Sequence, residues 1–227
     1  MTEETAALCG LMRDRARTYG MLARLFREEI DRDVLKELQG MHFPCATGAP
    51  AVDEGYRMMF DYLKTAWDDS VTELAIDYVR TFIGHGVNGY SAAYPFESVY
   101  TSERRLLMQE ARAEVLATLR ANNLKRGSWN EGEDHIALEL EFMQRVGLRC
   151  AEALETGDSD EAVRQLEIQH AFMREHLLNW IPLLAADMLS FSRTSFYRGL
   201  GTLAQGYVEA DEQIVAEMLE GAHDAAA

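Results

Sequence analysis

The chain has 227 residues, of which 48% are hydrophobic and 26% charged, a globular composition that can bury a core without disulfides or metals. Its formal net charge is -16. An acidic surface repels phosphate backbones and anionic lipid heads, which argues against nucleic-acid and membrane-surface roles and favours basic ligands, including arginine-rich peptides.

The cysteines and the first residues indicate the compartment. Cys9, Cys45 and Cys150 form no CxxC pair and are odd in number, which suits free thiols in a reducing cytosol. The opening residues MTEET contain neither the basic n-region nor the apolar h-region of a secretory signal. We therefore expect a cytoplasmic protein with no stable membrane insertion.

Apolar residues recur at three- and four-residue steps along the first half of the chain, which predicts amphipathic helices. Ser70 and Glu73 form a capping-box pattern, and Ser102 is the expected start of a further helix. Clustered glycines and prolines predict loops. The expected helices are a long one over 8–26, followed by 31–39, 53–67, 70–83 and 102–122, with loops at 40–50 and 84–95.

The same periodicity continues in the second half. The expected helices are 134–156, 160–180, 183–206 and 209–221, and a break near Ser192 is left open as an alternative for the third. Pro182 is expected to end or kink the second of them. No segment alternates with a period of two residues, so no strand is predicted. We expect an all-α fold, a single-domain bundle of about ten helices over residues 1–227, with a hinge at 123–133 between two helical halves.

Catalytic motifs are missing from the sequence, which has no GxSxG, Walker loop, GxGxxG or HExxH. We therefore expect no enzyme, no cofactor and no metal. One alternative is a helical metalloprotein or enzyme using Glu167 and His170, which form an ExxH pair on a predicted helix. Di-iron bundles use two such pairs with two further glutamates, and a second pair is not found.

A helical transcriptional regulator is the other alternative. Such a protein needs a basic recognition helix. The segment MRDRAR at residues 12–17 is locally basic, but Asp14 interrupts it and the helix carries a strong core face. We therefore expect no nucleic-acid partner.

Three segments carry a more specific signal: YPFESVY at 94–100, EGEDH at 131–135 and HLLNWIP at 176–182. In this order they resemble motifs of the TorD/DmsD-like redox-enzyme maturation chaperones, relatives of the nitrate reductase delta-subunit group. The likeness extends over residues 15–185, although Gly132 stands where that family usually has proline.

The resemblance implies a cytoplasmic chaperone in anaerobic respiration. It would bind the twin-arginine leader or the body of a molybdopterin-containing oxidoreductase, and hold back export until the cofactor is inserted. The identity of the oxidoreductase stays open, as does the choice between leader and mature enzyme. The hinge leaves room for helix exchange in a homodimer.

A twin-arginine leader has a cationic head and an apolar middle, so its receptor needs carboxylates and an adaptable apolar surface. On the hinge side we expect Glu131, Asp134 and His135, with Glu133 adding charge. The expected neighbouring wall is Tyr94, Pro95, Phe96, Glu97, Ser98 and Tyr100, and further apolar surface would come from Tyr90, Met58 and Met59. The alternative for these residues is structural: core packing, or for Asp134 a place at a helix N-terminus.

Overall fold

The computed structural model describes residues 2–84, 92–125, 127 and 129–226. Over these residues the fold is all-α, as predicted, and the one element of β pairing is an isolated bridge between Phe96 and His135. The helices, in chain order, are α1 (Glu3–Arg27), α2 (Arg32–Gly40), α3 (Pro50–Leu63), α4 (Ser70–Tyr78), α5 (Glu97–Thr101), α6 (Glu110–Ala121), α7 (Ile136–Thr156), α8 (Ser159–Phe172), α9 (Leu178–Phe191) and α10 (Ser195–Ala226).

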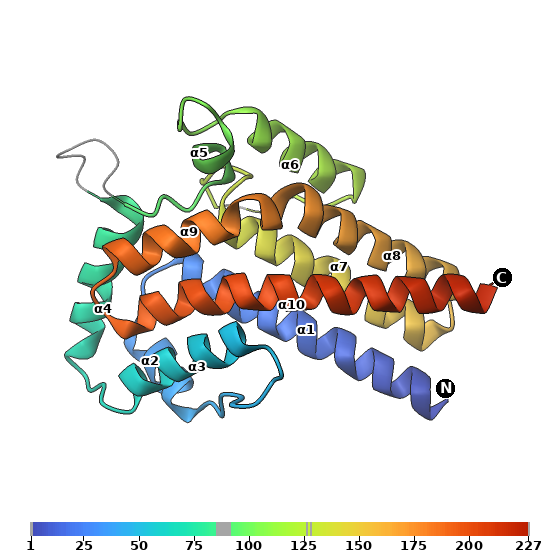
Figure 1. Cartoon of the computed structure of the whole chain (residues 1–227), viewed down its shortest axis with the longest axis horizontal. Helices are drawn as coiled ribbons and strands as arrows, with labels where there is room; N and C mark the ends of the chain where they lie inside the picture. The colour runs from blue at the N-terminus through green and yellow to red at the C-terminus, as the bar shows by residue number, and fades with distance from the viewer. Residues whose placement is uncertain (1, 85–91, 126, 128, 227) are drawn as a thin grey trace.

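The long helices lie side by side and share one core (Figure 1). Helix α1 packs along α7, α7 along α8, and α10 along both α3 and α9. Their apolar faces supply large side chains that are fully buried, among them Tyr19, Phe142, Phe172, Trp180 and Tyr197. Burial of these faces is the main force holding the bundle. The expected hinge at 123–133 stays a prediction.

Glycines set the distance between α3 and α10. A Cβ at Gly55 would lie 2.5 Å from the backbone nitrogen of Leu203, and one at Gly206 would lie 2.6 Å from the Cβ of Ala51. The sequence predicted that a helix ends at residue 206. This prediction is wrong, because α10 continues without a break from Ser195 to Ala226. Gly206 is a packing residue, and its cost within a helix is offset by the close approach that it permits.

A second correction concerns the predicted helix 102–122. Residues 102–109 form a loop between α5 and α6, and Ser102 follows α5 instead of beginning a helix. Arg105 and Met108 have φ of 50° and 61°, in the left-handed region that a right-handed helix cannot contain.

Two π-helical turns lengthen neighbouring helices, Val79–Ile83 after α4 and Met173–Leu177 between α8 and α9. Pro182 does not end a helix but lies within the first turns of α9. A π-helical turn directly precedes α9, and such turns interrupt the regular α-helical hydrogen-bond ladder. Among the described residues, no helix is long and apolar enough to cross a bilayer.

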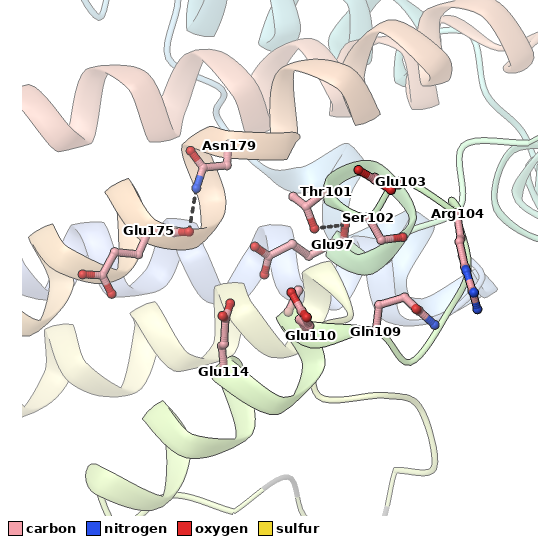
Figure 2. A pocket seen from close by; sticks show the side chains of 11 residues that line it. Glu97, Thr101, Ser102, Glu103, Arg104, Gln109, Glu110, Glu114, Glu175 and Asn179 are labelled. Carbon is pink, nitrogen blue, oxygen red and sulfur yellow. Dashed lines mark hydrogen bonds between the residues drawn. The ribbon is translucent and has the colours of Figure 1, made fainter.

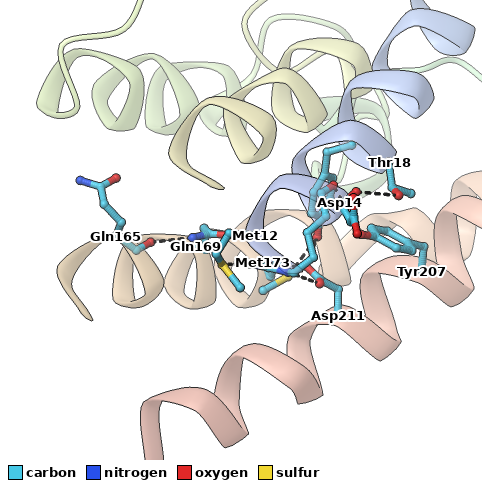
Figure 3. A network of polar contacts seen from close by, with 10 residues as sticks. Met12, Asp14, Thr18, Gln165, Gln169, Met173, Tyr207 and Asp211 are labelled. Carbon is cyan, nitrogen blue, oxygen red and sulfur yellow. Dashed lines mark hydrogen bonds and ion pairs between the residues drawn. The ribbon is translucent and has the colours of Figure 1, made fainter. Parts of the chain in front are cut away.

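A buried ion pair joins α1 to α10 (Figure 3). The Arg15 guanidinium donates to both carboxylate oxygens of Asp211, from Nε at 2.5 Å and from Nη2 at 2.8 Å, and the Tyr19 hydroxyl donates to the same carboxylate at 2.7 Å. Arg15 is 4% exposed and Asp211 is 2% exposed. Burial and the Asp211 carboxylate raise the pKa of Tyr19 well above its ordinary value, so its hydroxyl stays a donor.

We expect Asp211→Asn to lower the free energy of unfolding by about 3–5 kcal/mol, because it leaves the buried Arg15 charge without its partner. Asp14→Asn is the matched control, since Asp14 pairs with Arg17 at an exposed site, where such pairs contribute about 1 kcal/mol or less. Urea unfolding followed by circular dichroism measures both. Equal losses in the two variants would contradict a structural role for the buried pair.

Candidate functional site: an acidic cleft beside α5

The structure brings the segments 94–100 and 131–135 together. The backbone N–H of Glu97 donates to the Asp134 carbonyl at 2.9 Å, and that of Ile136 donates to the Pro95 carbonyl at 2.9 Å. The Asp134 carboxylate accepts the backbone N–H of Ser98 at 3.1 Å. These three bonds attach the start of α5 to the start of α7.

Asp134 and His135 are 1% and 3% exposed. His135 is the N-cap of α7, where its Nδ1 accepts the N–H of Ala137 at 3.1 Å. Its ring lies edge-on to Phe96 and to Trp129, with centroids 4.9 and 4.7 Å away. Because neither Asp134 nor His135 faces solvent, the geometry does not support their expected direct contact with a peptide, and it favours the structural alternative for both.

The remaining expected residues divide by exposure. Glu131 is exposed, whereas Tyr94, Phe96 and Tyr100 are half-buried and Pro95, Glu97 and Ser98 are buried. Glu133 is buried, and its Oε2 lies 2.6 Å from Arg112 Nε. The two methionines expected at the site lie away from it, on α3. Met59 is buried there, and Met58 packs against α10. Tyr90 lies outside the described residues.

A cavity of about 520 Å³ opens beside α5 (Figure 2), and we call it the acidic cleft. Five carboxylates line it, with Arg104 as the one basic group among its described lining residues. Glu97 comes from α5, Glu103 from the loop 102–109, Glu110 and Glu114 from α6, and Glu175 from the π-helical turn before α9. Its other lining residues are Thr101, Ser102, Gln109, Ala111 and Asn179.

Sequence reasoning missed Glu103, Glu110, Glu114 and Glu175. Glutamates spaced along a helix ordinarily face solvent and mark no site. Here the loop at 102–109 separates α6 from α5, and this arrangement brings these glutamates together beside α5. The spacing of four residues between Glu110 and Glu114, which puts both on one helix face, was the available signal.

The third segment supplies Asn179 to the lining of the acidic cleft and contacts Glu97. His176 Nδ1 lies 3.0 Å from Glu97 Oε2, and both residues are buried. The Trp180 indole donates to Glu139 Oε2 at 3.1 Å. Burial and the nearby Glu97 raise the pKa of Glu139 well above its ordinary value, which favours the protonated form of this carboxyl. All three motifs therefore meet at Glu97.

Glu167 and His170 do not come together with further ligands. His170 Nε2 lies 3.1 Å from Glu212 Oε1, and Glu167 lies 3.9 Å from His223. Across the part of the chain that the structure describes, no three His, Cys, Asp or Glu side chains are grouped so as to hold a metal ion.

Comparison with known proteins identifies the class to which this chain belongs, the redox-enzyme maturation chaperones of the TorD/DmsD type, which are not enzymes. The family model of the nitrate reductase delta subunit matches residues 48–186, and the chain belongs to that family. The resemblance seen in the three motifs is confirmed.

Curated relatives named chaperone protein TorD align over most of their length. That of Photobacterium profundum is 27% identical over 205 residues, 87% of this chain and 92% of the relative. That of Vibrio cholerae serotype O1 (El Tor Inaba) is 24% identical over 216 residues, which cover 92% of this chain and 95% of the relative. That of Shewanella pealeana is 27% identical over 215 residues, 88% of each.

The buried cap predicts a pH-dependent stability. Burial, together with the positive charge of Arg27, lowers the pKa of His135 from 6.5 to about 3. The unfolded chain therefore binds a proton at this site near pH 6.5, and the folded chain binds it only near pH 3. The contribution to stability is complete above pH 6.5 and is lost as the pH falls towards 3.

We expect wild-type protein to lose about 2 kcal/mol more stability than His135→Asn between about pH 7 and pH 5. Asparagine retains an oxygen that can cap α7, so the variant should still fold. Urea midpoints at the two pH values test this, with His42→Asn, at an exposed position, as the control. The same pH dependence in His135→Asn and wild type would contradict the buried neutral imidazole.

Proposed function

We propose that this chaperone works in the cytoplasm and binds the twin-arginine leader of a molybdopterin-containing oxidoreductase in the acidic cleft, during cofactor insertion and before export. The observation that carries the proposal is the gathering of five carboxylates in one cavity beside the YPFESVY segment, against a single arginine among the described lining residues. A peptide with two adjacent arginines complements this charge.

The chemistry of the acidic cleft suits binding without transformation. Carboxylates accept paired hydrogen bonds from a guanidinium group. Glu103, Glu110, Glu114 and Glu175 are exposed, so they lose little hydration when a cation arrives, and each pair contributes about 0.2–1 kcal/mol. Several such pairs give moderate affinity that falls with salt, and the summed field speeds encounter.

In this proposal the residues expected from the sequence have two roles. Glu97 lines the acidic cleft and faces the ligand. Tyr94, Phe96 and Tyr100 are half-buried outside the cleft lining, where they would offer apolar surface near α5, and Glu131 would add charge at the surface. Pro95, Ser98 and Asp134 fix the position of α5 through bonds to the start of α7, and His135 caps α7.

Isothermal titration calorimetry with synthetic twin-arginine leaders tests the proposal. We expect Glu103→Gln/Glu110→Gln/Glu114→Gln to weaken binding about tenfold and to flatten its salt dependence, because three weak ion pairs are lost. The control with equal charge change is Glu37→Gln/Glu217→Gln/Glu220→Gln, at exposed positions that do not line the cleft. Absence of binding to leaders of all molybdoenzymes from the same genome would overturn the function.

A further inference from the structure

The loop between α5 and α6 carries three consecutive large apolar side chains that face solvent. Leu106, Leu107 and Met108 are 52%, 46% and 68% exposed, and we call them the apolar tip. Apolar side chains exposed in a contiguous run indicate an interaction surface more often than those scattered singly.

The loop holds the apolar tip at the rim of the acidic cleft. Arg104 and Gln109, the residues flanking 105–108, both line the cavity (Figure 2). The backbone N–H of Gln109 donates to Ser98 Oγ at 3.1 Å, and its side-chain amide donates to the Leu107 carbonyl at 2.9 Å. The loop is therefore fastened to α5 and does not fold its apolar residues into the core.

Two further features of the loop are costly in isolation. Arg105 and Met108 adopt left-handed φ angles, which costs about 1–3 kcal/mol for a residue with a side chain. In the described structure the buried Ser102 hydroxyl oxygen has no hydrogen-bond partner, although Ser102 lines the cleft. A bound backbone could supply that partner.

We infer that the apolar tip receives the apolar segment that follows the arginine pair of the leader. The leader then lies with its cationic head among the carboxylates and its apolar middle on Leu106, Leu107 and Met108, so the two parts of the site fix its direction. This inference rests on the proposed function and adds to it the contact and the orientation.

Charge selects this occupant over others. A second copy of the chain would bring two acidic clefts together at a net charge of -16 each, and anionic lipid heads would meet the same repulsion. A segment that is apolar and directly joined to arginines is attracted to the cleft and covers the tip at the same time.

The test uses fluorescence anisotropy with three labelled peptides: a model leader with two adjacent arginines followed by a leucine- and alanine-rich run, its cationic head alone, and the full peptide with the run changed to serine. We expect Leu106→Ser/Leu107→Ser/Met108→Ser to bind the full leader about tenfold more weakly, since apolar burial is lost, and to bind the other two peptides as wild type does.

The control is Phe60→Ser/Trp67→Ser/Ile76→Ser, which changes three side chains of comparable exposure, 50%, 64% and 60%, that do not line the acidic cleft. It should bind all three peptides normally. The single variants Leu106→Ser and Met108→Ser should show the same pattern with smaller losses, which keeps the test decisive if the triple variant does not fold.

The outcomes separate the two proposals. If the full leader binds the tip variant as tightly as wild type but binds the glutamine variant of the cleft weakly, the inference fails and the function stands. An equal loss for the head peptide would also overturn the inference, because the loop would then only shape the cleft. If wild type binds none of the leaders, both fall. A wild-type dimer in sedimentation that the tip variant abolishes would assign the surface to a second copy.

Discussion

The attachment of α5 to the start of α7 is the interaction on which the site depends. Helix α5 has five residues, too few to be stable alone, and it is held by the backbone bonds of Glu97 and Ile136 and by the Asp134 carboxylate. Asp134 therefore contributes as an acceptor for the Ser98 N–H, a group at a helix start that would otherwise lack a partner. Without this attachment Glu97 and the loop 102–109 would have no fixed place beside α6 and the π-helical turn.

The acidic cleft combines a buried part with a solvated rim. Glu97 forms the buried part of the lining and contacts His176, and behind it Glu139 accepts a hydrogen bond from the Trp180 indole. A raised pKa at Glu139 keeps one of two neighbouring carboxyls neutral, which relieves their repulsion. At the rim, the glutamates of α6 and the loop stay hydrated. The buried part gives the cleft its shape, and the rim supplies charges that can pair with a ligand at little desolvation cost.

Much of the fold could be predicted because α1, α7 and α8 are long and amphipathic, and their periodicity survives in a single sequence. The break at 102–109 could not, because Leu106 and Leu107 continue apolar spacing and the left-handed residues there are not glycines. At Gly206 the sequence predicted a helix end where the helix continues. A glycine that ends a helix and one that permits close packing cannot be told apart until the partner helix is known. At the site, Asp134 and His135 were expected to meet the ligand because they are polar residues in a distinctive motif, yet both instead accept backbone N–H groups at helix starts. The glutamates of the cleft were missed because only tertiary packing gathers them.

Exposure of the charged rim has a consequence for how a chaperone works. A client that must be handed on cannot be held by buried ion pairs, since separating them would leave unpaired charges in the core at a cost of several kcal/mol. Pairs that remain in water are individually weak and exchange with hydration, and apolar contacts at a surface loop lack the geometric demands of hydrogen bonds. Specificity then comes from having charge and apolar surface side by side at a fixed spacing, while each contact is weak enough to break. The proposed site separates these requirements, because buried contacts of α5 with α7 and α9 hold it in place, while the loop, α6 and the π-helical turn carry the exposed groups that would touch the ligand.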